Sequence, residues 1–483
     1  MSAPETIADL MSHSGVGFGT SGARGRVVAL DDELVAAYTG AFVAAQRQQH
    51  GLAAGTPIAV GYDRRPSSPT IAAAVVRGIA RAGHVPVDAG LVPTPALAGW
   101  AIAHGWPCVM VTGSHIPADR NGLKFYRADG ELDKDDEAAI TGQPVPTGTL
   151  ADASPRRAAD PDTPTRWYRD RFVRAFGADA LSGCTVAAFG HSAVGRDLTA
   201  RILEALGATV DRVGDTDEFV AIDTEAIDEA THEAARAWAA SGRYAAIVST
   251  DADGDRPLLA DERGRWLRGD QVGIMCARRL AARVVVTPVS TSSAVEGCGW
   301  FRTVRRTRIG SPYVIAGMQA EPGSHVFGFE ANGGVLLGDG FTGPAGPLPA
   351  LHTRDALTSL VVLLHAVVVD GRPLSAHVAD LPARFGASGL LRSVTRPRAL
   401  SEIERLLAGG AAAVAKLLGP DLGAIASIDA TDGIRIVFAS GEIIHLRPSG
   451  NAPELRCYVE ADDEVRASEL VARGLAAVDH WRG

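Results

Sequence analysis

The sequence contains little cysteine and no long apolar run. Its five cysteines are odd in number, and none stands in the short spacing typical of a metal site. We therefore expect reduced thiols and a cytoplasmic protein. The most apolar stretch, residues 357–369, contains a histidine and two hydroxyl side chains and is too short to span a bilayer. It predicts a buried helix rather than a membrane anchor.

Basic residues are fewer than acidic ones, 47 against 56, so the formal net charge is −9. This balance argues against nucleic acid or an anionic membrane as the main partner. The first residues, Met-Ser-Ala-Pro-Glu-Thr, lack the basic and then apolar stretches of a signal peptide, so none is expected. A hydrophobic content of 46% and 483 residues indicate globular α/β material in three or four domains.

Ser114 stands in a turn that follows an apolar, strand-like run at residues 106–111. The glycine, proline and asparagine around it predict a loop at the carboxyl end of a buried parallel strand, where open α/β sheets place their ligands. A serine in such a loop is either an exposed nucleophile or an ordinary turn residue. His115 and Lys124 lie nearby and no acyl-transfer triad is evident, so the pattern favours phosphoryl chemistry.

Three aspartates, Asp251, Asp253 and Asp255, alternate after the strand-like run at residues 244–249. In an extended chain their carboxylates point the same way and repel one another unless a cation lies between them. Ligands that are all oxygen indicate Mg²⁺ or Ca²⁺. The spacing overlaps that of a calcium-binding hand loop, but Arg256 stands where that loop needs glycine. The pattern therefore favours Mg²⁺ with a phosphorylated partner over calcium or a solvated acidic turn.

A loop near the carboxyl terminus offers several groups to an anion. It carries two arginines and three small polar residues, namely Arg447, Ser449, Gly450, Asn451 and Arg456. The arginines supply bidentate donors, and the small residues supply a hydroxyl, open backbone N–H groups and an amide. The alternative is a hairpin turn with charged flanks. We predict a phosphate clamp, and one that grips only the non-reacting phosphate would serve both orientations of a substrate.

Four motifs together resemble, in order and spacing, the signature loops of the α-D-phosphohexomutases. They are Thr-Gly-Ser-His-Ile-Pro at 112–117, Asp-Ala-Asp-Gly-Asp-Arg at 251–256, Gly-Phe-Glu-Ala-Asn-Gly-Gly at 328–334 and Arg-Pro-Ser-Gly-Asn-Ala-Pro-Glu-Leu-Arg at 447–456. Thr-Ser-Gly-Ala-Arg-Gly-Arg at 20–26 resembles the amino-terminal motif of that superfamily. The resemblance covers nearly the whole chain and implies an isomerase of carbohydrate metabolism, of the phosphomannomutase/phosphoglucomutase type.

In that family a serine carries a phosphoryl group and three aspartates hold Mg²⁺ against it. The resemblance gives the first role to Ser114, also as a metal contact, and the second to Asp251, Asp253 and Asp255. The phosphoserine hands its phosphoryl group to one end of a hexose monophosphate and forms a hexose 1,6-bisphosphate, which we also expect as activator. The sugar then turns around and the other phosphoryl group returns to the serine, so phosphate moves between C1 and C6.

The remaining roles are also implied by the resemblance. Arg24 and Lys124 are candidates for moving the proton of the substrate hydroxyl and stabilising the transferring group, while His115 either bonds the phosphoserine or caps the turn. The other substrate-binding candidates are Arg256, Glu330, Asn332 and the five residues of the clamp loop. Asn332 stands where relatives more often have serine, so the sequence leaves the sugar open. We predict mannose, glucose or both, with glucosamine as the alternative.

Two other classes of protein share some of these residues. A metal-dependent sugar phosphatase would use the same aspartates, and a non-catalytic phosphosugar-binding protein would keep the clamp. The completeness of the motifs favours the mutase, as a monomer or homodimer that binds a phosphosugar.

The resemblance implies three related α/β domains with mixed sheets and a smaller carboxyl-terminal α+β domain, arranged around a central cleft. We expect a phosphoserine domain, a metal-binding domain, a sugar-binding domain and a phosphate-binding domain at residues 1–150, 151–262, 263–378 and 379–483. A Pro/Asp/Thr-rich stretch at 144–165 predicts a linker, and residues 379–383 predict a hinge before the last domain.

Overall fold

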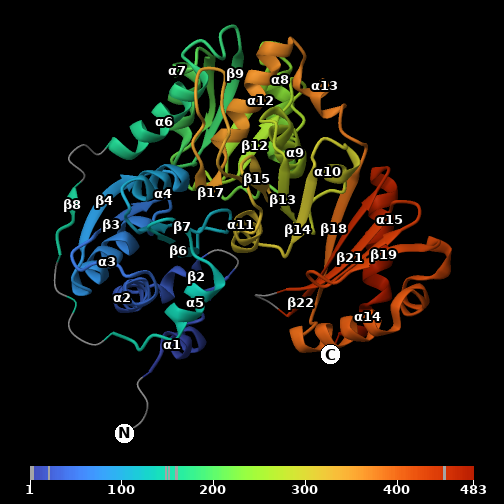
Figure 1. Cartoon of the computed structure of the whole chain (residues 1–483), viewed down its shortest axis with the longest axis horizontal. Coiled ribbons are helices and arrows are strands. Elements are labelled where there is room, and N and C mark those ends of the chain that lie inside the picture. Colours follow the sequence, from blue (N-terminus) through green and yellow to red (C-terminus); the bar gives the residue numbers. More distant parts are fainter. Residues whose placement is uncertain are drawn as a thin grey trace.

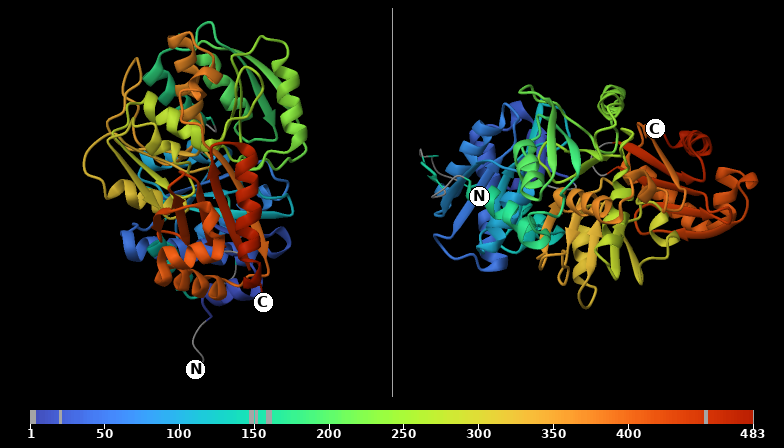
Figure 2. Two further views of the ribbon diagram at one scale, coloured as in Figure 1. Left: turned by 90° about the vertical axis from the view of Figure 1, so that its right-hand side faces the viewer. Right: turned by 90° about the horizontal axis from the view of Figure 1, so that it is seen from above.

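The computed structural model describes residues 5–19, 22–146, 150, 153–157, 162–449 and 453–482. These residues form four β-sheets with helices packed on them, which we call the first to fourth units in chain order. Figure 1 shows the first unit at the lower left, the second and third at the top, and the fourth at the right. The view from above in Figure 2 shows the first and fourth units at opposite ends of the molecule.

The first unit has strand order β1-β2-β6-β5-β3-β4-β8, with β7 paired to β6. Its strands are β1 (Gly17–Phe18), β2 (Ala23–Arg26), β3 (Pro57–Tyr62), β4 (Val85–Leu91), β5 (Cys108–Val111), β6 (Arg120–Arg127), β7 (Gly130–Glu131) and β8 (Arg156–Arg157). Its helices are α1 (Ile7–Ser14), α2 (Asp32–His50), α3 (Ser68–Arg81), α4 (Thr94–Ala103) and α5 (Lys134–Thr141). Because β8 pairs in parallel with β4, the linker prediction at 144–165 was wrong for this part of the chain.

The second unit has strand order β10-β9-β11-β12, and the third has β14-β13-β15-β16-β17. The strands are β9 (Thr185–His191), β10 (Thr209–Asp215), β11 (Ala246–Thr250), β12 (Pro257–Ala260), β13 (Val284–Pro288), β14 (Thr303–Thr307), β15 (Val326–Phe329), β16 (Val335–Leu337) and β17 (Leu351–Asp355). The helices are α6 (Thr163–Phe176), α7 (Arg196–Ala205), α8 (Glu229–Ala239), α9 (Gly269–Arg279), α10 (Ala294–Gly297), α11 (Ser311–Gln319), α12 (Leu357–Asp370) and α13 (Leu374–Val378).

The first three units repeat one arrangement of strands. In each, a buried strand (β5, β11 or β15) runs parallel to a central strand and is followed by an antiparallel partner (β6, β12 or β16). The loop at the carboxyl end of that buried strand contains a sequence motif every time. Continuous apolar runs favour such fully buried strands, and the loops are left at one edge of each sheet.

The fourth unit is a five-stranded antiparallel sheet with order β18-β22-β21-β20-β19. Its elements are β18 (Phe385–Arg392), α14 (Arg396–Leu418), β19 (Ile425–Asp429), β20 (Ile434–Phe438), β21 (Ile443–Pro448), β22 (Glu454–Ala461) and α15 (Glu464–Ala477). The sequence had not predicted the outer strands β18 and β19. The predicted fold class, three related α/β parts and a smaller α+β part, is confirmed.

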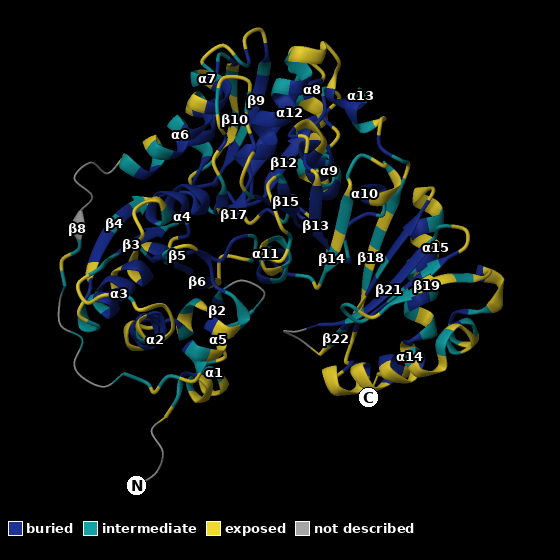
Figure 3. Ribbon diagram, in the orientation of Figure 1, coloured by how far each residue is buried: buried dark blue, intermediate teal, exposed yellow. Residues whose placement is uncertain are grey.

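The hydrophobic cores separate the fourth unit from the others. The largest core runs through the first three units, whereas the fourth unit has its own core between Leu391 and Trp481. Figure 3 shows buried strands in the interior and the mostly exposed helix α14 on the outside. The apolar stretch at 357–369 forms α12, which is buried over most of its length. In the described part of the chain, no helix combines the length and apolar character that crossing a membrane requires. The four domain boundaries stay predictions.

Candidate active site

Ser114 lies in the loop between β5 and β6. Its φ of 54° is a left-handed conformation that residues other than glycine seldom adopt. The Ser114 N–H donates to Thr112 Oγ1 at 2.8 Å, and Thr112 Oγ1 donates to Asp63 Oδ2 at 2.7 Å. The prediction of an exposed serine was wrong, because Ser114 has no exposed surface. The second unit covers it, and its Oγ donates to Asp251 Oδ2 at 2.7 Å.

Arg65, in the loop after β3, holds the serine loop in shape. Its guanidinium donates at 2.6–3.0 Å to four backbone carbonyls of the loop, those of Ser114, Ile116, Pro117 and Arg120. Its Nε donates to Asp63 Oδ2 at 3.2 Å, and the ring of Phe219 from the second unit stacks 4.2 Å from its Cζ. Arg65 and Asp63 are both buried, so this pair fixes the unusual backbone at Ser114.

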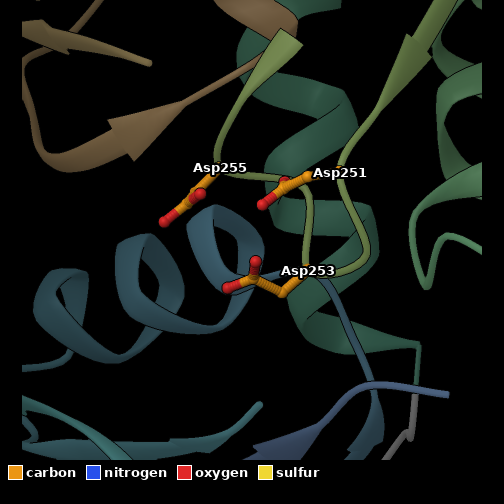
Figure 4. Close-up of side chains that lie close together, drawn as sticks. All are labelled: Asp251, Asp253 and Asp255. Carbon is orange, nitrogen blue, oxygen red and sulfur yellow. The ribbon is translucent and has the colours of Figure 1, made fainter. Parts of the chain in front are cut away.

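The aspartate loop is a tight hairpin between β11 and β12. The Asp251 N–H donates to the Arg256 carbonyl at 3.0 Å, and Asp251 Oδ1 accepts from the N–H groups of Gly254 and Arg256. One oxygen from each of the three carboxylates lies within 4.8 Å of the others, and Figure 4 shows them turned toward a common space. The predicted convergence is therefore confirmed. Its predicted cause was wrong, since a turn at Gly254 with φ of 79° brings the carboxylates together rather than an extended chain.

Two units surround this cluster with counter-charges and donors. From the first unit, Lys124 Nζ lies 2.5 Å from Asp253 Oδ2 and 2.6 Å from Asp255 Oδ2, and Thr94 Oγ1 donates to Asp253 Oδ2 at 2.6 Å. From the third unit, Arg354 Nη2 lies 3.0 Å from Asp255 Oδ2. All three carboxylates are fully buried, so these cations offset their repulsion.

The carboxyl groups differ in their affinity for protons. Burial raises the pKa of Asp251 well above its usual range, and the charges of Asp253 and Asp255 raise it further. Burial would also raise the pKa of Asp253, but the ammonium of Lys124 holds it below the usual range. Arg354 does the same for Asp255 against its burial. Asp253 and Asp255 are thus anionic, and they lie beside Asp251, whose carboxyl group binds a proton more readily.

The residues of this cluster fit a hard metal ion. Asp253 Oδ1 and Asp255 Oδ1 are buried, and neither has a hydrogen-bond partner among the described residues. Buried carboxylate oxygens without donors are costly unless a cation satisfies them. The donor set is entirely oxygen, the chemistry that Mg²⁺ and Ca²⁺ prefer.

The other predicted residues of the first unit lie close to the same centre. His115 Nδ1 is 3.4 Å from Ser114 Oγ, and burial together with Arg256 lowers the pKa of His115 to about 2, so the ring is neutral. Arg24 on β2 is surrounded by protein, and this desolvation, followed by the charge of Arg256, lowers its pKa to about 10. Arg256 Nε lies 3.8 Å from Asp255 Oδ1. The structure thus brings these side chains to the edge of the aspartate cluster.

The sugar-loop candidates follow β15 and are nearly buried. Glu330 Oε2 accepts from Arg354 Nη1 at 2.9 Å, and the backbone of Glu330 closes the loop through Gly334. Asn332 Oδ1 accepts from the N–H of Gly334 at 2.9 Å, so this oxygen shapes its own loop. An added Cβ at Gly334 would lie 2.8 Å from the Asp255 carbonyl, which shows how closely the sugar loop and the aspartate loop approach.

Arg354 on β17 is a residue that the sequence analysis missed. Its guanidinium joins Asp255 to Glu330, and its backbone N–H donates at 3.1 Å to Glu131 Oε1 of the first unit. Glu131 Oε2 also accepts from Ser311 Oγ at 2.7 Å. The buried Arg354 therefore links the aspartate loop, the loop that carries Glu330 and the first unit. The only local signal in the sequence was a pair of charged residues, Arg354 and Asp355, at the end of the mostly polar run Leu-His-Thr-Arg-Asp.

The clamp arginines sit on neighbouring strands of the fourth unit. Arg447 on β21 and Arg456 on β22 are directly opposite each other, an arrangement of like charges that an anion would relieve. Ser449 is buried, while Gly450 and Asn451 lie outside the described residues, as do Thr20 and Ser21 of the amino-terminal motif. Within the described part of the chain, no hydrogen bond or ion pair joins either arginine to the aspartate cluster.

Glu225, a second missed residue, connects these regions electrostatically. Desolvation by the surrounding protein raises the pKa of Glu225, although the residue keeps contact with solvent. The charges of Arg256 and Arg456 lower that pKa, and the charge of Glu330 raises it. Glu225 of the second unit therefore lies within electrostatic range of Glu330 in the third unit and Arg456 in the fourth.

Family models of the phosphoglucomutases/phosphomannomutases match alpha/beta/alpha domain I at residues 15–144, alpha/beta/alpha domain III at 268–385 and the C-terminal domain at 392–476. The chain is 44% identical to a phosphomannomutase of Sinorhizobium fredii, over 96% of this chain and 98% of the relative. It is 41% identical to a phosphomannomutase of Salmonella muenchen, with 97% of each covered. A phosphoglucomutase/phosphomannomutase family protein from Burkholderia thailandensis shares the fold, with a TM-score of 0.72 at 18% identity over 96% of this chain and 97% of that one. The resemblance inferred from the sequence is confirmed.

We predict that Arg65→Met destabilises the protein by about 3–5 kcal/mol, because it leaves a buried aspartate and four loop carbonyls without their donor. Thermal unfolding followed by circular dichroism measures the effect. Arg64→Met is the matched control, since the one ion pair of Arg64 within the described part of the chain is a partly exposed contact with Asp197 at 3.3 Å, worth about 0–1 kcal/mol. Equal unfolding midpoints for the two variants would contradict the anchoring role of Arg65.

Proposed function

Because the chain belongs to the phosphoglucomutase/phosphomannomutase family of α-D-phosphohexomutases, we propose that it interconverts hexose 1-phosphate and hexose 6-phosphate through a phosphoserine at Ser114. The observation that carries this proposal is the contact between Ser114 Oγ and Asp251 Oδ2 at 2.7 Å, at the centre of the aspartate cluster. A hydroxyl held against three carboxylates and several cations suits phosphoryl transfer, where positioning and charge neutralisation supply most of the catalysis.

In the forward direction the O6 hydroxyl of a hexose 1-phosphate attacks the phosphorus of phosphorylated Ser114. The new O6–P bond forms, the Oγ–P bond breaks, and the hydroxyl proton passes to a base of the first unit. We propose that Lys124 takes that proton and that Arg24 neutralises the charge of the moving group, with His115 beside the serine oxygen. Lys124 can accept a proton only as the uncharged amine, so its ammonium, which is paired with Asp253 and Asp255 here, must first give up a proton. After the bisphosphate turns around, Ser114 Oγ loses its proton to a base of the first unit and attacks the phosphorus at C1. The P–O1 bond breaks, O1 takes up the proton held from the first step, and hexose 6-phosphate leaves the restored phosphoserine. A hexose 1,6-bisphosphate is the activator that first loads Ser114.

Asp251, Asp253 and Asp255 would hold Mg²⁺, together with an oxygen on Ser114. When bound, the ion supplies positive charge to the oxygens of the transferring phosphoryl group. Lys124 and Arg354 hold the carboxylates of Asp253 and Asp255, and backbone N–H groups of the hairpin hold that of Asp251. Arg256 adds a cation at their edge. The chain's own residues thus form a preorganised binding site with positive charge for the phosphoryl group.

We assign the sugar to the third unit and the distal phosphate, the one that does not react, to the fourth unit. We propose that Glu330 and Asn332 contact the sugar hydroxyls, and that Arg447, Ser449, Gly450, Asn451 and Arg456 hold the phosphate that does not react. Because the same loop then serves both ends of the substrate, one site suffices for both half-reactions. The identity to two phosphomannomutases supports mannose phosphate as a substrate. The match to the phosphoglucomutase/phosphomannomutase models supports glucose phosphate as a second substrate.

Ser114→Ala should abolish mutase turnover, because the attacking oxygen is lost. Intact-mass analysis of the wild type after incubation with glucose 1,6-bisphosphate should show one added phosphoryl group, and peptide mapping should place it on Ser114. Ser12→Ala, an exposed serine of the same unit, is the control and should behave as wild type. Near-full activity of Ser114→Ala would reject the assignment.

Asp253→Asn should weaken Mg²⁺ binding by at least about tenfold, or about 1.4 kcal/mol, because it removes one anionic ligand of the cluster. Isothermal titration of the apo protein with Mg²⁺ measures this directly. The control is Asp211→Asn in the same unit, whose carboxylate bonds Arg243 and Tyr244 on the surface. An unchanged dissociation constant in Asp253→Asn would show that the ion does not bind there.

Comparison of kcat/KM for mannose, glucose and glucosamine 1-phosphates, with a catalytic amount of bisphosphate, tests the substrate class. We expect turnover of mannose 1-phosphate, accompanied by glucose 1-phosphate. Preference for glucosamine 1-phosphate would make the chain a phosphoglucosamine mutase. Release of inorganic phosphate without isomerisation would make it a phosphatase.

A further inference from the structure

The turn between β19 and β20 is held rigidly against the strand that carries Arg447. Within it, Asp429 Oδ1 accepts from the N–H of Thr431 at 2.8 Å, and His445 Nε2 donates to the Asp432 carbonyl at 2.6 Å. Gly433 has a φ of 83°, and an added Cβ there would lie 2.3 Å from the Leu446 carbonyl. The turn therefore has little freedom relative to β21, where Arg447 begins the clamp loop.

Asp432 uses one carboxylate oxygen to contact two units. Its Oδ2 accepts from Arg447 Nε of the clamp at 2.8 Å and from the Ile309 N–H of the third unit at 3.0 Å. Beside it, Arg308 Nε donates to the Thr431 carbonyl at 3.2 Å. Residues 308 and 309 belong to the loop between β14 and α11, so the fourth unit is fastened to the third unit next to the clamp.

This contact forms part of the wall of a cavity of about 430 Å³. Asp432, Arg308 and Arg447 line the cavity from the third and fourth units, and Phe18 and Lys134 line it from the first. The fourth unit has a hydrophobic core of its own, so its position depends on contacts such as this one. The Asp432 contact lies where the three units meet.

A guanidinium has five N–H donors, and a phosphate is bound best through a pair of them on one edge. Holding Nε with a carboxylate fixes the plane of the Arg447 side chain and so the direction of its other donors. The side chains of Asp432 and Arg447 are 19% and 18% exposed, so solvent only partly screens their pairing.

We propose that Asp432 is a positioning residue that orients Arg447 for the distal phosphate and fastens the fourth unit to the 308–309 loop. This inference rests on the proposed function, in which Arg447 binds the non-reacting phosphate. Both ends of the substrate pass through that clamp, so Asp432 should matter equally for 1-phosphates and 6-phosphates. It has no part in the transfer at Ser114 itself.

Asp432→Ala and the milder Asp432→Asn test the proposal. We expect KM to rise about tenfold for both regioisomers in Asp432→Ala, and less in Asp432→Asn, while kcat, Mg²⁺ binding and phosphorylation of Ser114 stay close to wild type. Small-angle scattering of the unliganded Ala variant should show a more expanded molecule. Asp421→Asn is the matched control, because Asp421 is an exposed acid of the same unit paired with Arg473.

Binding of inorganic phosphate, measured by calorimetry, separates this inference from the proposed function. If the chain is no mutase at all, the wild type shows no isomerisation, yet Asp432→Ala should still bind phosphate more weakly than wild type. Because Asp432 acts through Arg447, its loss should add little to Arg447→Ala. Unchanged KM and phosphate affinity in Asp432→Ala, a change for only one regioisomer, or full additivity with Arg447→Ala would overturn the proposal. The thermal unfolding midpoints of the variants identify any that fail to fold. If Asp432→Ala does not fold, the KM values and phosphate affinity of Asp432→Asn test the proposal instead.

Discussion

Three fully buried carboxylates whose oxygens lie within 4.8 Å of one another are the constraint on which the rest of this structure depends. Their repulsion has to be offset, and the offsetting groups come from other units: Lys124 and Thr94 from the first, and Arg354 from the third. The same charges that prepare a site for a cation therefore also hold three α/β units together. The largest hydrophobic core also runs through these three units.

The repeated strand arrangement makes such a site possible. The loops after β5, β11 and β15 occupy equivalent places at the carboxyl ends of buried parallel strands, so one fold unit, used three times, presents a serine, an acidic hairpin and a glutamate. Arg354 and Arg65 then lock two of these loops by hydrogen bonds to carboxylates and carbonyls. The fourth unit differs from the other three in fold and has a hydrophobic core of its own.

The sequence predicted the strands before the serine loop and the aspartate loop, because continuous apolar runs and the loops after them depend on local residues. It also predicted the converging aspartates, although a turn at Gly254 rather than an extended chain brings them together. It did not predict β15, which precedes the loop that carries Glu330. It could not predict the burial of Ser114, which depends on a different unit lying over the loop. Arg354, Glu225 and Asp432 were missed for the same reason, since their partners are distant in sequence. The sequence did not predict the outer strands β18 and β19, because neither contains the continuous apolar run of a central strand.

Transfer of a labelled phosphate tests the central claim most directly. A single turnover begins with unlabelled phosphoenzyme and mannose 1-phosphate that carries ³²P. The account predicts that the label ends on Ser114 and that the mannose 6-phosphate formed is unlabelled, because its phosphate comes from the enzyme. Label that appears as inorganic phosphate, or that stays on the sugar throughout the isomerisation, would contradict a phosphoserine mutase.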